Sequence, residues 1–191
     1  MNQISKNVLV INPGDEIPQG NSLKIMLLGS FPANQNDPKF DWCGKFIDGL
    51  VALTNPDDPK SLLQFRGNLY TIMDPRAPVS NQEINDQNGE FVQSFNLIND
   101  WANACDCLFF NFLRKSTATL PLYYFASFSG LGKIVVRMSD GYVNSGIVKV
   151  QCQRNNIPLL DSAHGNVFSV LQTMYAFIPA FQNMQRFQLP E

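Results

Sequence analysis

The sequence is poor in charged residues and contains a single histidine. Only 16% of its 191 residues are Asp, Glu, Lys or Arg, and the formal net charge is −2. Binding to a phosphate backbone needs clustered Lys and Arg, and none cluster here, so we exclude a DNA or RNA polymer as the main partner. One histidine cannot form a Ser/His or Cys/His site without partners, and we interpret His164 as a capping or exposed residue. A small ligand or a protein partner fits this composition better.

Metal and cofactor motifs are also missing. No H-x-x-x-H, C-x-x-C or paired Asp-x-Asp pattern occurs, so no metal site is expected. The phosphate-cradling patterns G-x-G-x-x-G and G-x-x-x-x-G-K-[ST] are absent. The segment SGLGK at 129–133 leads into a predicted strand, so we interpret it as a turn. The sequence therefore predicts neither a bound metal nor a cofactor.

Cysteine is scarce, and long apolar runs are absent. The four cysteines are too few and too scattered for a disulfide framework, which predicts reduced core thiols at Cys43, Cys105, Cys107 and Cys152. No window reaches the length of about 20 apolar residues that a membrane span needs, and no basic region followed by an apolar stretch opens the sequence. These absences predict a cytoplasmic protein without membrane contact.

Hydrophobic residues make up 45% of the chain and aromatic residues 12%, which suits a packed core. We predict a single domain over residues 1–191, with a core at about 24–178, an N-terminal strand and loop at 1–23 and a C-terminal tail at 179–191. Apolar runs predict strands at 8–11, 24–31, 68–76, 107–112, 133–138 and 157–161. Helical spacing of apolar residues predicts helices at about 41–53, 90–104, 117–128, 145–155 and 165–178.

The alternation of strands and helices predicts an α/β fold with about five parallel core strands and helices on both faces. Ligands of such sheets bind beyond the carboxyl ends of the strands. We expect Asp41 to cap the helix that begins beside Trp42. The candidate site residues are those that follow the strands, together with Asp41 and Trp42 at the start of this helix: Gly29, Ser30, Phe31, Asp41, Trp42, Asp74, Pro75, Arg76, Asn111, Phe112, Asp140 and Tyr142.

Two groups of candidates have both a functional and a structural interpretation. Gly29 permits close backbone approach and Ser30 offers a hydroxyl, so the segment up to Trp42 could close over a small ligand, or it could simply turn the chain. In the tripeptide DPR at 74–76, Arg76 could bind a phosphate or hold Asp74, or the two could form an ordinary surface ion pair.

These segments together resemble the nucleoside 2-deoxyribosyltransferase-like family, which has a flavodoxin-like fold. The matching segments are LLGSF at 27–31 followed by DW at 41–42, DPR at 74–76 where the family tends to have Asn-Pro-Arg, ACDCLFFNF at 104–112, and GKIVVRMSDGYVNSGIVKVQCQRNNIPLL at 132–160. The resemblance implies a doubly wound sheet and a small-molecule ligand of the nucleoside or nucleotide type. It also implies a homo-oligomer, which is usual for the family.

The catalytic residue of that family has no equivalent in this sequence. Family enzymes exchange the base of a 2′-deoxynucleoside through a glutamate that attacks C1′, a step related to retaining glycoside hydrolysis. By resemblance, that glutamate would fall within TATLPLYYFASF at 117–128, where Pro121 takes its place. No Asp or Glu occurs between Asp106 and Asp140. An apolar, aromatic wall suits contact with a base or a protein partner, but it cannot attack C1′.

Three functions are compatible with the sequence. The first is a nucleoside- or nucleotide-binding protein that is catalytically altered or inactive and acts as a sensor, a sequestering protein or an interaction module. The second is an active deoxyribosyltransferase or N-glycoside hydrolase that uses Asp74 or Asp140. The third is a structural or assembly protein whose aromatic, Gln-rich tail at 177–191 forms the contact surface, unless that tail packs back on its own core.

Overall fold

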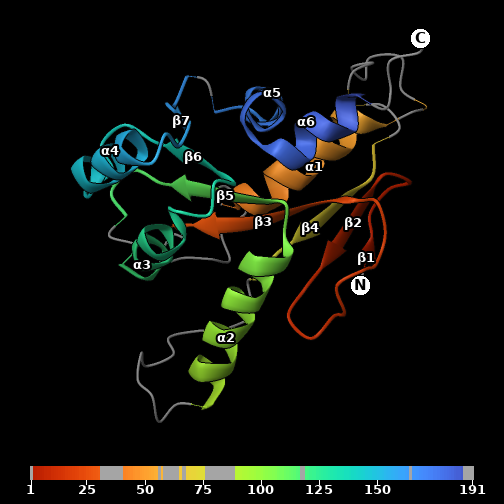
Figure 1. Cartoon of the computed structure of the whole chain (residues 1–191), viewed down its shortest axis with the longest axis horizontal. Helices are drawn as coiled ribbons and strands as arrows, with labels where there is room; N and C mark the ends of the chain where they lie inside the picture. The colour runs from red at the N-terminus through yellow and green to blue at the C-terminus, as the bar shows by residue number, and fades with distance from the viewer. Residues whose placement is uncertain are drawn as a thin grey trace.

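A mostly parallel sheet forms the centre of the chain (Figure 1). The computed structural model describes residues 2–30, 41–55, 57, 65, 68–75, 89–116, 119–163 and 165–186. Within these residues the sheet has 7 strands, and β1 alone runs antiparallel to its neighbour. The strands are β1 (Asn2–Gln3), β2 (Val8–Ile11), β3 (Leu23–Gly29), β4 (Tyr70–Met73), β5 (Cys107–Phe112), β6 (Ile134–Met138) and β7 (Leu159–Leu160).

Helices cover both faces of the sheet. One face carries α1 (Trp42–Thr54), α5 (Val167–Phe177) and α6 (Pro179–Arg186), which lie together in Figure 1. The other face carries α2 (Gly89–Ala104), α3 (Thr119–Phe128) and α4 (Ser145–Arg154). Each face has its own hydrophobic cluster, and the central strands contribute side chains to both. None of the helices in the described part of the chain is long and apolar enough to span a membrane.

The strand order confirms a flavodoxin-like, doubly wound α/β fold. The order across the sheet is β1-β2-β4-β3-β5-β6-β7, so the five strands from β3 onward follow the flavodoxin-like order 2-1-3-4-5. From β3 the chain crosses to β4, which lies on one side of β3. It later returns to β5, which lies on the other side of β3. Strand order therefore reverses between β3 and β5, where Gly29 is paired with Asn111. In open α/β sheets this is the place where ligands bind.

Some element bounds differ from those that the sequence predicts. The sheet gains β1 and β2 at one edge, and β3 ends at Gly29, two residues earlier than expected. The predicted tail contains a helix, α6, which begins at Pro179, because proline is well tolerated in the first turn of a helix. Phe181 of this helix is fully buried against the core, so the described part of the tail packs on its own domain.

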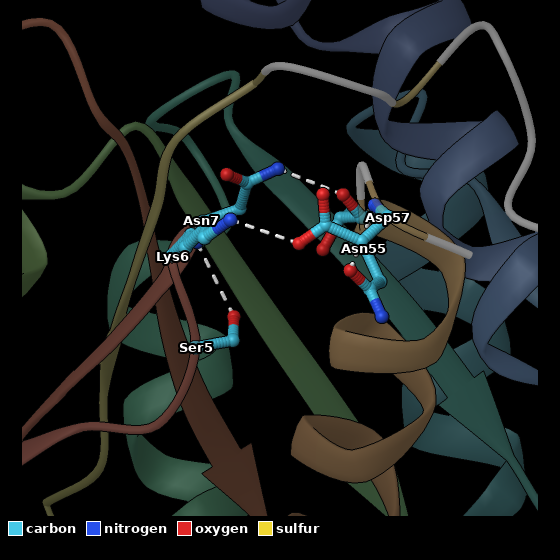
Figure 2. A network of polar contacts seen from close by, with 6 residues as sticks. Ser5, Lys6, Asn7, Asn55 and Asp57 are labelled. Atoms are coloured by element: carbon cyan, nitrogen blue, oxygen red, sulfur yellow. Dashed lines mark hydrogen bonds and ion pairs between the residues drawn. The ribbon is translucent and has the colours of Figure 1, made fainter.

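A small polar network fastens the N-terminal segment to the end of α1 (Figure 2). The Asn7 side-chain amide donates to the Thr54 carbonyl at 2.7 Å, and this hydrogen bond is buried. Lys6 and Asp57 form an ion pair at 2.8 Å with side chains that are 74% and 69% exposed. An ion pair so exposed contributes little to stability, so the buried amide is the more important connection.

Candidate ligand-binding site

A cavity of about 300 Å³ lies on the α1 and α5 face of the sheet, beside the point where strand order reverses. This volume is at the lower end of the range for small-molecule sites. The floor comes from β5 and β6, and the walls come from the first turns of α1 and α5 and the residue that precedes α5. The lining residues are Trp42, Lys45, Phe46, Phe109, Asn111, Arg137, Gly165, Asn166 and Val167.

One side of the cavity is aromatic. Phe109 on β5 stacks against Phe46 on α1, with ring centroids 5.2 Å apart, and meets Trp42 edge to face at 5.9 Å. The Trp42 indole N–H donates to the Ser30 carbonyl at 3.0 Å, which ties the first turn of α1 to the end of β3. Trp42 is only 8% exposed. Phe109 thus contacts both other rings, and the three form a packed aromatic wall.

The other side of the cavity is polar and positively charged. Asn111 is 1% exposed, and its side-chain oxygen accepts a long hydrogen bond of 3.4 Å from the Arg137 guanidinium. Lys45, one turn into α1, is exposed and adds a second positive charge among the lining residues. Asn111 and Arg137 are paired neighbours on β5 and β6, so the sheet register brings their side chains to the same level.

Arg137 is the most unusual group in the cavity. Its Nε atom is buried without a hydrogen-bond partner, and no ion pair with a carboxylate is present among the described residues. Partial burial lowers the pKa of the guanidinium from its ordinary value, because it removes water from the charged form. A desolvated cation without a counter-ion is costly, so an anion that entered the cavity would be bound favourably.

The caps of α1 and α5 fix the helix ends that line the cavity. As the sequence predicts, Asp41 caps α1, and its carboxylate accepts from the Gly44 amide at 2.9 Å. Asn166 caps α5 in the same way and accepts from the Ser169 amide at 2.8 Å. Both capping side chains are therefore occupied within their own helices, and the α5 N-terminus presents its positive dipole end at the cavity.

Four of the predicted site residues lie in or against the cavity. Trp42 and Asn111 line it. Gly29 and Ser30 adjoin it, because the Ser30 amide donates to the Asn111 carbonyl at 2.8 Å. Gly29 has a φ of +147°, and a β-carbon there would collide with the Asn111 backbone. The glycine thus permits close approach of two strands, and the Ser30 hydroxyl is buried without a hydrogen-bond partner.

Phe112, Tyr142 and Pro121 do not line the cavity. Phe112 and Tyr142 belong to the hydrophobic cluster on the opposite face of the sheet, where their rings stack with centroids 4.9 Å apart. Successive side chains of β5 point to opposite faces, so Phe112 cannot share the face of Asn111. Pro121 is the third residue of α3, in the first turn, where proline is tolerated. Phe31, Arg76 and His164 lie outside the described residues.

The two candidate acids also lie away from the cavity lining. Asp74 follows β4, which is two strands from β5, a distance of about 10 Å at ordinary strand spacing. It is 4% exposed, and its amide donates to the Ile11 carbonyl, with Pro75 next along the chain. Asp140 is exposed in the turn after β6, where its amide donates to the Ser162 hydroxyl at 3.0 Å. Neither residue is part of the lining.

Neither a protein-family model nor a curated protein matches this chain. The resemblance to the nucleoside 2-deoxyribosyltransferase-like family therefore stays a prediction from the sequence motifs. The shared fold alone does not supply a function, because flavodoxin-like sheets carry many unrelated activities.

Several lining residues were not among the sequence-predicted candidates. Phe46 and Phe109 look like ordinary core residues in the sequence, and the residues at 165–167 were expected only as the start of a helix. Arg137 had a signal that could have identified it, since it is a charged residue near the carboxyl end of the apolar strand IVVRM. A charge in such a strand is costly unless a partner or ligand compensates it.

The lining residues offer two kinds of contact to a ligand. Guanidinium and amide groups can donate to an anionic or carbonyl oxygen, and the aromatic wall can contact a planar ring. No Asp or Glu occurs among the described lining residues, and no cluster of three metal-ligating side chains occurs in the part of the chain that the structure describes. The described lining thus offers hydrogen-bond donors and an aromatic surface to a ligand, and it contains no carboxylate that could act as a nucleophile or general base.

Proposed function

We propose that the protein binds a ligand of the nucleoside or nucleotide type in the cavity between α1, α5 and the sheet, without exchanging its base. The observation that carries this proposal is the combination of an aromatic wall with Arg137 and Asn111, in a cavity whose described lining contains no carboxylate. A planar base fits against the rings, while the amide and the guanidinium donate hydrogen bonds. Binding without turnover suits a sensor or a sequestering protein.

The charge of the cavity also opposes base exchange. Cleavage of an N-glycosidic bond passes through a transition state in which positive charge develops on the sugar. A carboxylate would stabilise that charge, whereas Arg137 and Lys45 would raise the energy of the transition state. Activity through Asp74 or Asp140 would require a sugar placed well away from the aromatic wall.

Tryptophan fluorescence tests binding at this location. The chain has 2 tryptophans: Trp42 lines the cavity, and Trp101 is buried in the cluster on the opposite face. In a Trp101→Phe variant, deoxyadenosine or its 5′-monophosphate should quench the remaining Trp42 emission in a saturable way. In the matched Trp42→Phe variant, the emission of Trp101 should not change. Absence of quenching by any nucleoside or nucleotide, together with an unchanged melting temperature, would overturn the proposal.

Chromatography of free base tests whether the protein is catalytically silent. Pure protein incubated with 2′-deoxynucleosides and their 5′-monophosphates should release no base above the uncatalysed rate. A ligand at 100 times its dissociation constant should still add about 2.7 kcal/mol to the free energy of unfolding. Base release that disappears in Asp74→Asn or Asp140→Asn would instead establish an active enzyme.

A further inference from the structure

We propose that the polar end of the cavity is a subsite for a dianionic phosphate monoester, held by the Arg137 guanidinium, the Asn111 side-chain amide and the first turn of α5. This inference rests on the proposed function, because it concerns the same cavity. It adds the chemical class of the ligand's charged group and names the residue that selects it.

The charges around the cavity favour a ligand with two negative charges. The Arg137 guanidinium lines it, the described lining contains no acidic residue, and the N-terminal end of α5 adds a partial positive charge. A phosphate monoester carries a charge of about −1.5 to −2 at neutral pH. A carboxylate carries a single negative charge and would leave part of this positive charge uncompensated.

Hydrogen-bond donors remain available at this end. Arg137 Nε is buried without a partner beside Gly165, and one terminal nitrogen makes only the long contact with Asn111, so the planar guanidinium keeps donor capacity for phosphate oxygens. The Asn111 oxygen accepts from Arg137 at 3.4 Å, which leaves the Asn111 NH₂ group to donate to a ligand. Asn166 caps only the Ser169 amide, so no described side chain occupies the amides of Val167 and Phe168.

Gly165 fixes the position of the guanidinium. A β-carbon at residue 165 would collide with Arg137 Nε and would lie 2.6 Å from its Cδ and 2.7 Å from its Cζ. The arginine therefore packs directly against the backbone that enters α5. A side chain at residue 165 would displace the guanidinium from this position.

Two pairs of probes separate the phosphate from the rest of the ligand. Isothermal titration calorimetry at fixed ionic strength would compare deoxyadenosine 5′-monophosphate with deoxyadenosine, and phenyl phosphate with benzoate. We expect each phosphate ester to bind about 10- to 100-fold more tightly than its partner, which is the range for hydrogen bonds to a charged group. If both members of a pair bind and their affinities are equal, the phosphate subsite is overturned.

Three variants assign the selectivity to Arg137. Arg137→Met should abolish the preference for phosphate esters, and Gly165→Ala should weaken it by displacing the guanidinium while the charge remains. Arg154→Met removes an exposed arginine from α4 and should leave both affinities unchanged. Arg137→Met should keep or raise the melting temperature, because it removes a desolvated cation without a counter-ion. A preference that survives in Arg137→Met would contradict the inference.

The outcomes distinguish this inference from the proposed function. If nucleosides bind and their monophosphates bind no better, the phosphate subsite is wrong and the proposed function stands. If phenyl phosphate binds but neither nucleosides nor nucleotides do, the subsite stands and the nucleoside proposal fails. If no probe binds, both fail.

Discussion

Two glycines, Gly29 and Gly165, let groups at the candidate site approach more closely than any other residue would allow. A β-carbon at Gly29 would collide with the Asn111 backbone, and one at Gly165 would collide with the Arg137 guanidinium. Gly29 also has a φ of +147°, a conformation that other residues rarely adopt. The positions of Asn111 and Arg137 in the cavity therefore depend on the absence of two side chains.

Replacement of Gly29 should be strongly destabilising. We expect Gly29→Ala to lower the free energy of unfolding by about 2–4 kcal/mol, because it adds backbone strain and forces β3 away from β5. Urea unfolding followed by circular dichroism measures this change. Gly146→Ala is the matched control, since a β-carbon at residue 146 in α4 meets no atom within 4 Å. That variant should change stability by less than about 1 kcal/mol, and a similar small effect for Gly29→Ala would contradict the role of Gly29.

At the scale of whole elements, β5 shows which features the sequence could predict. The apolar run CLFFNF predicts a strand at 107–112, and the structure has β5 at those residues. All of its side chains are buried, so no polar alternation marks the face to which each one points. Asn111 was therefore expected at the site together with Phe112, although the two belong to opposite faces. The cavity face is set by the packing of α1 and α5, which are far apart in the sequence.

The last helix was missed for a related reason. Pro179 interrupts the helical pattern, and the segment that follows is rich in glutamine, so it resembled a surface tail. Among the described side chains of this helix, at 179–183, the large buried one is Phe181, which is 0% exposed and meets Tyr175 edge to face at 5.2 Å. One buried residue in a polar segment is too weak a pattern to predict a packed helix.

Two phenylalanines near this junction give a matched test of how α6 contributes to the core. Phe181→Ala should lower the free energy of unfolding by about 3–5 kcal/mol, the range for removal of a buried aromatic ring. Phe177→Ala, at the end of α5, should change it by no more than about 0.5 kcal/mol, because Phe177 is 59% exposed. Chemical unfolding of both variants measures the difference. If Phe181→Ala lowers the free energy of unfolding no more than Phe177→Ala does, α6 is not part of the folded core.

At the scale of the whole molecule, the two faces of the sheet have separate cores that share the same strands. The sequence predicted the fold class because alternating strands and helices leave few other architectures, and the observed order 2-1-3-4-5 is that of a flavodoxin-like sheet. The edge strand β2 lies at the predicted residues 8–11, outside the five predicted core strands, whereas β1 was not predicted because a strand of 2 residues carries little pattern. Each face buries two cysteines that are not in disulfides: Cys43 and Cys107 on the α1 side, and Cys105 and Cys152 on the α2 side.

These buried thiols should make the protein less stable at alkaline pH. Burial raises the pKa of Cys105 to about 11 and that of Cys152 to about 12, from an ordinary value near 9. Above pH 9 the unfolded chain loses these protons while the folded chain keeps them, so the free energy of unfolding falls as pH rises. Each thiol should contribute a slope of about 1.4 kcal/mol per pH unit until its folded-state pKa is reached.

Urea unfolding between pH 7.5 and 10.5, in the presence of reductant, measures that slope. Cys152→Ala should flatten the alkaline slope by about 1.4 kcal/mol per pH unit, because one thiol no longer titrates in the unfolded chain. Val148→Ala is the matched control, since Val148 is also buried on α4 but does not titrate. It should lower stability by a similar amount at every pH and leave the slope unchanged. If Cys152→Ala and Val148→Ala have the same alkaline slope, the protonated state of the buried thiol does not couple to folding.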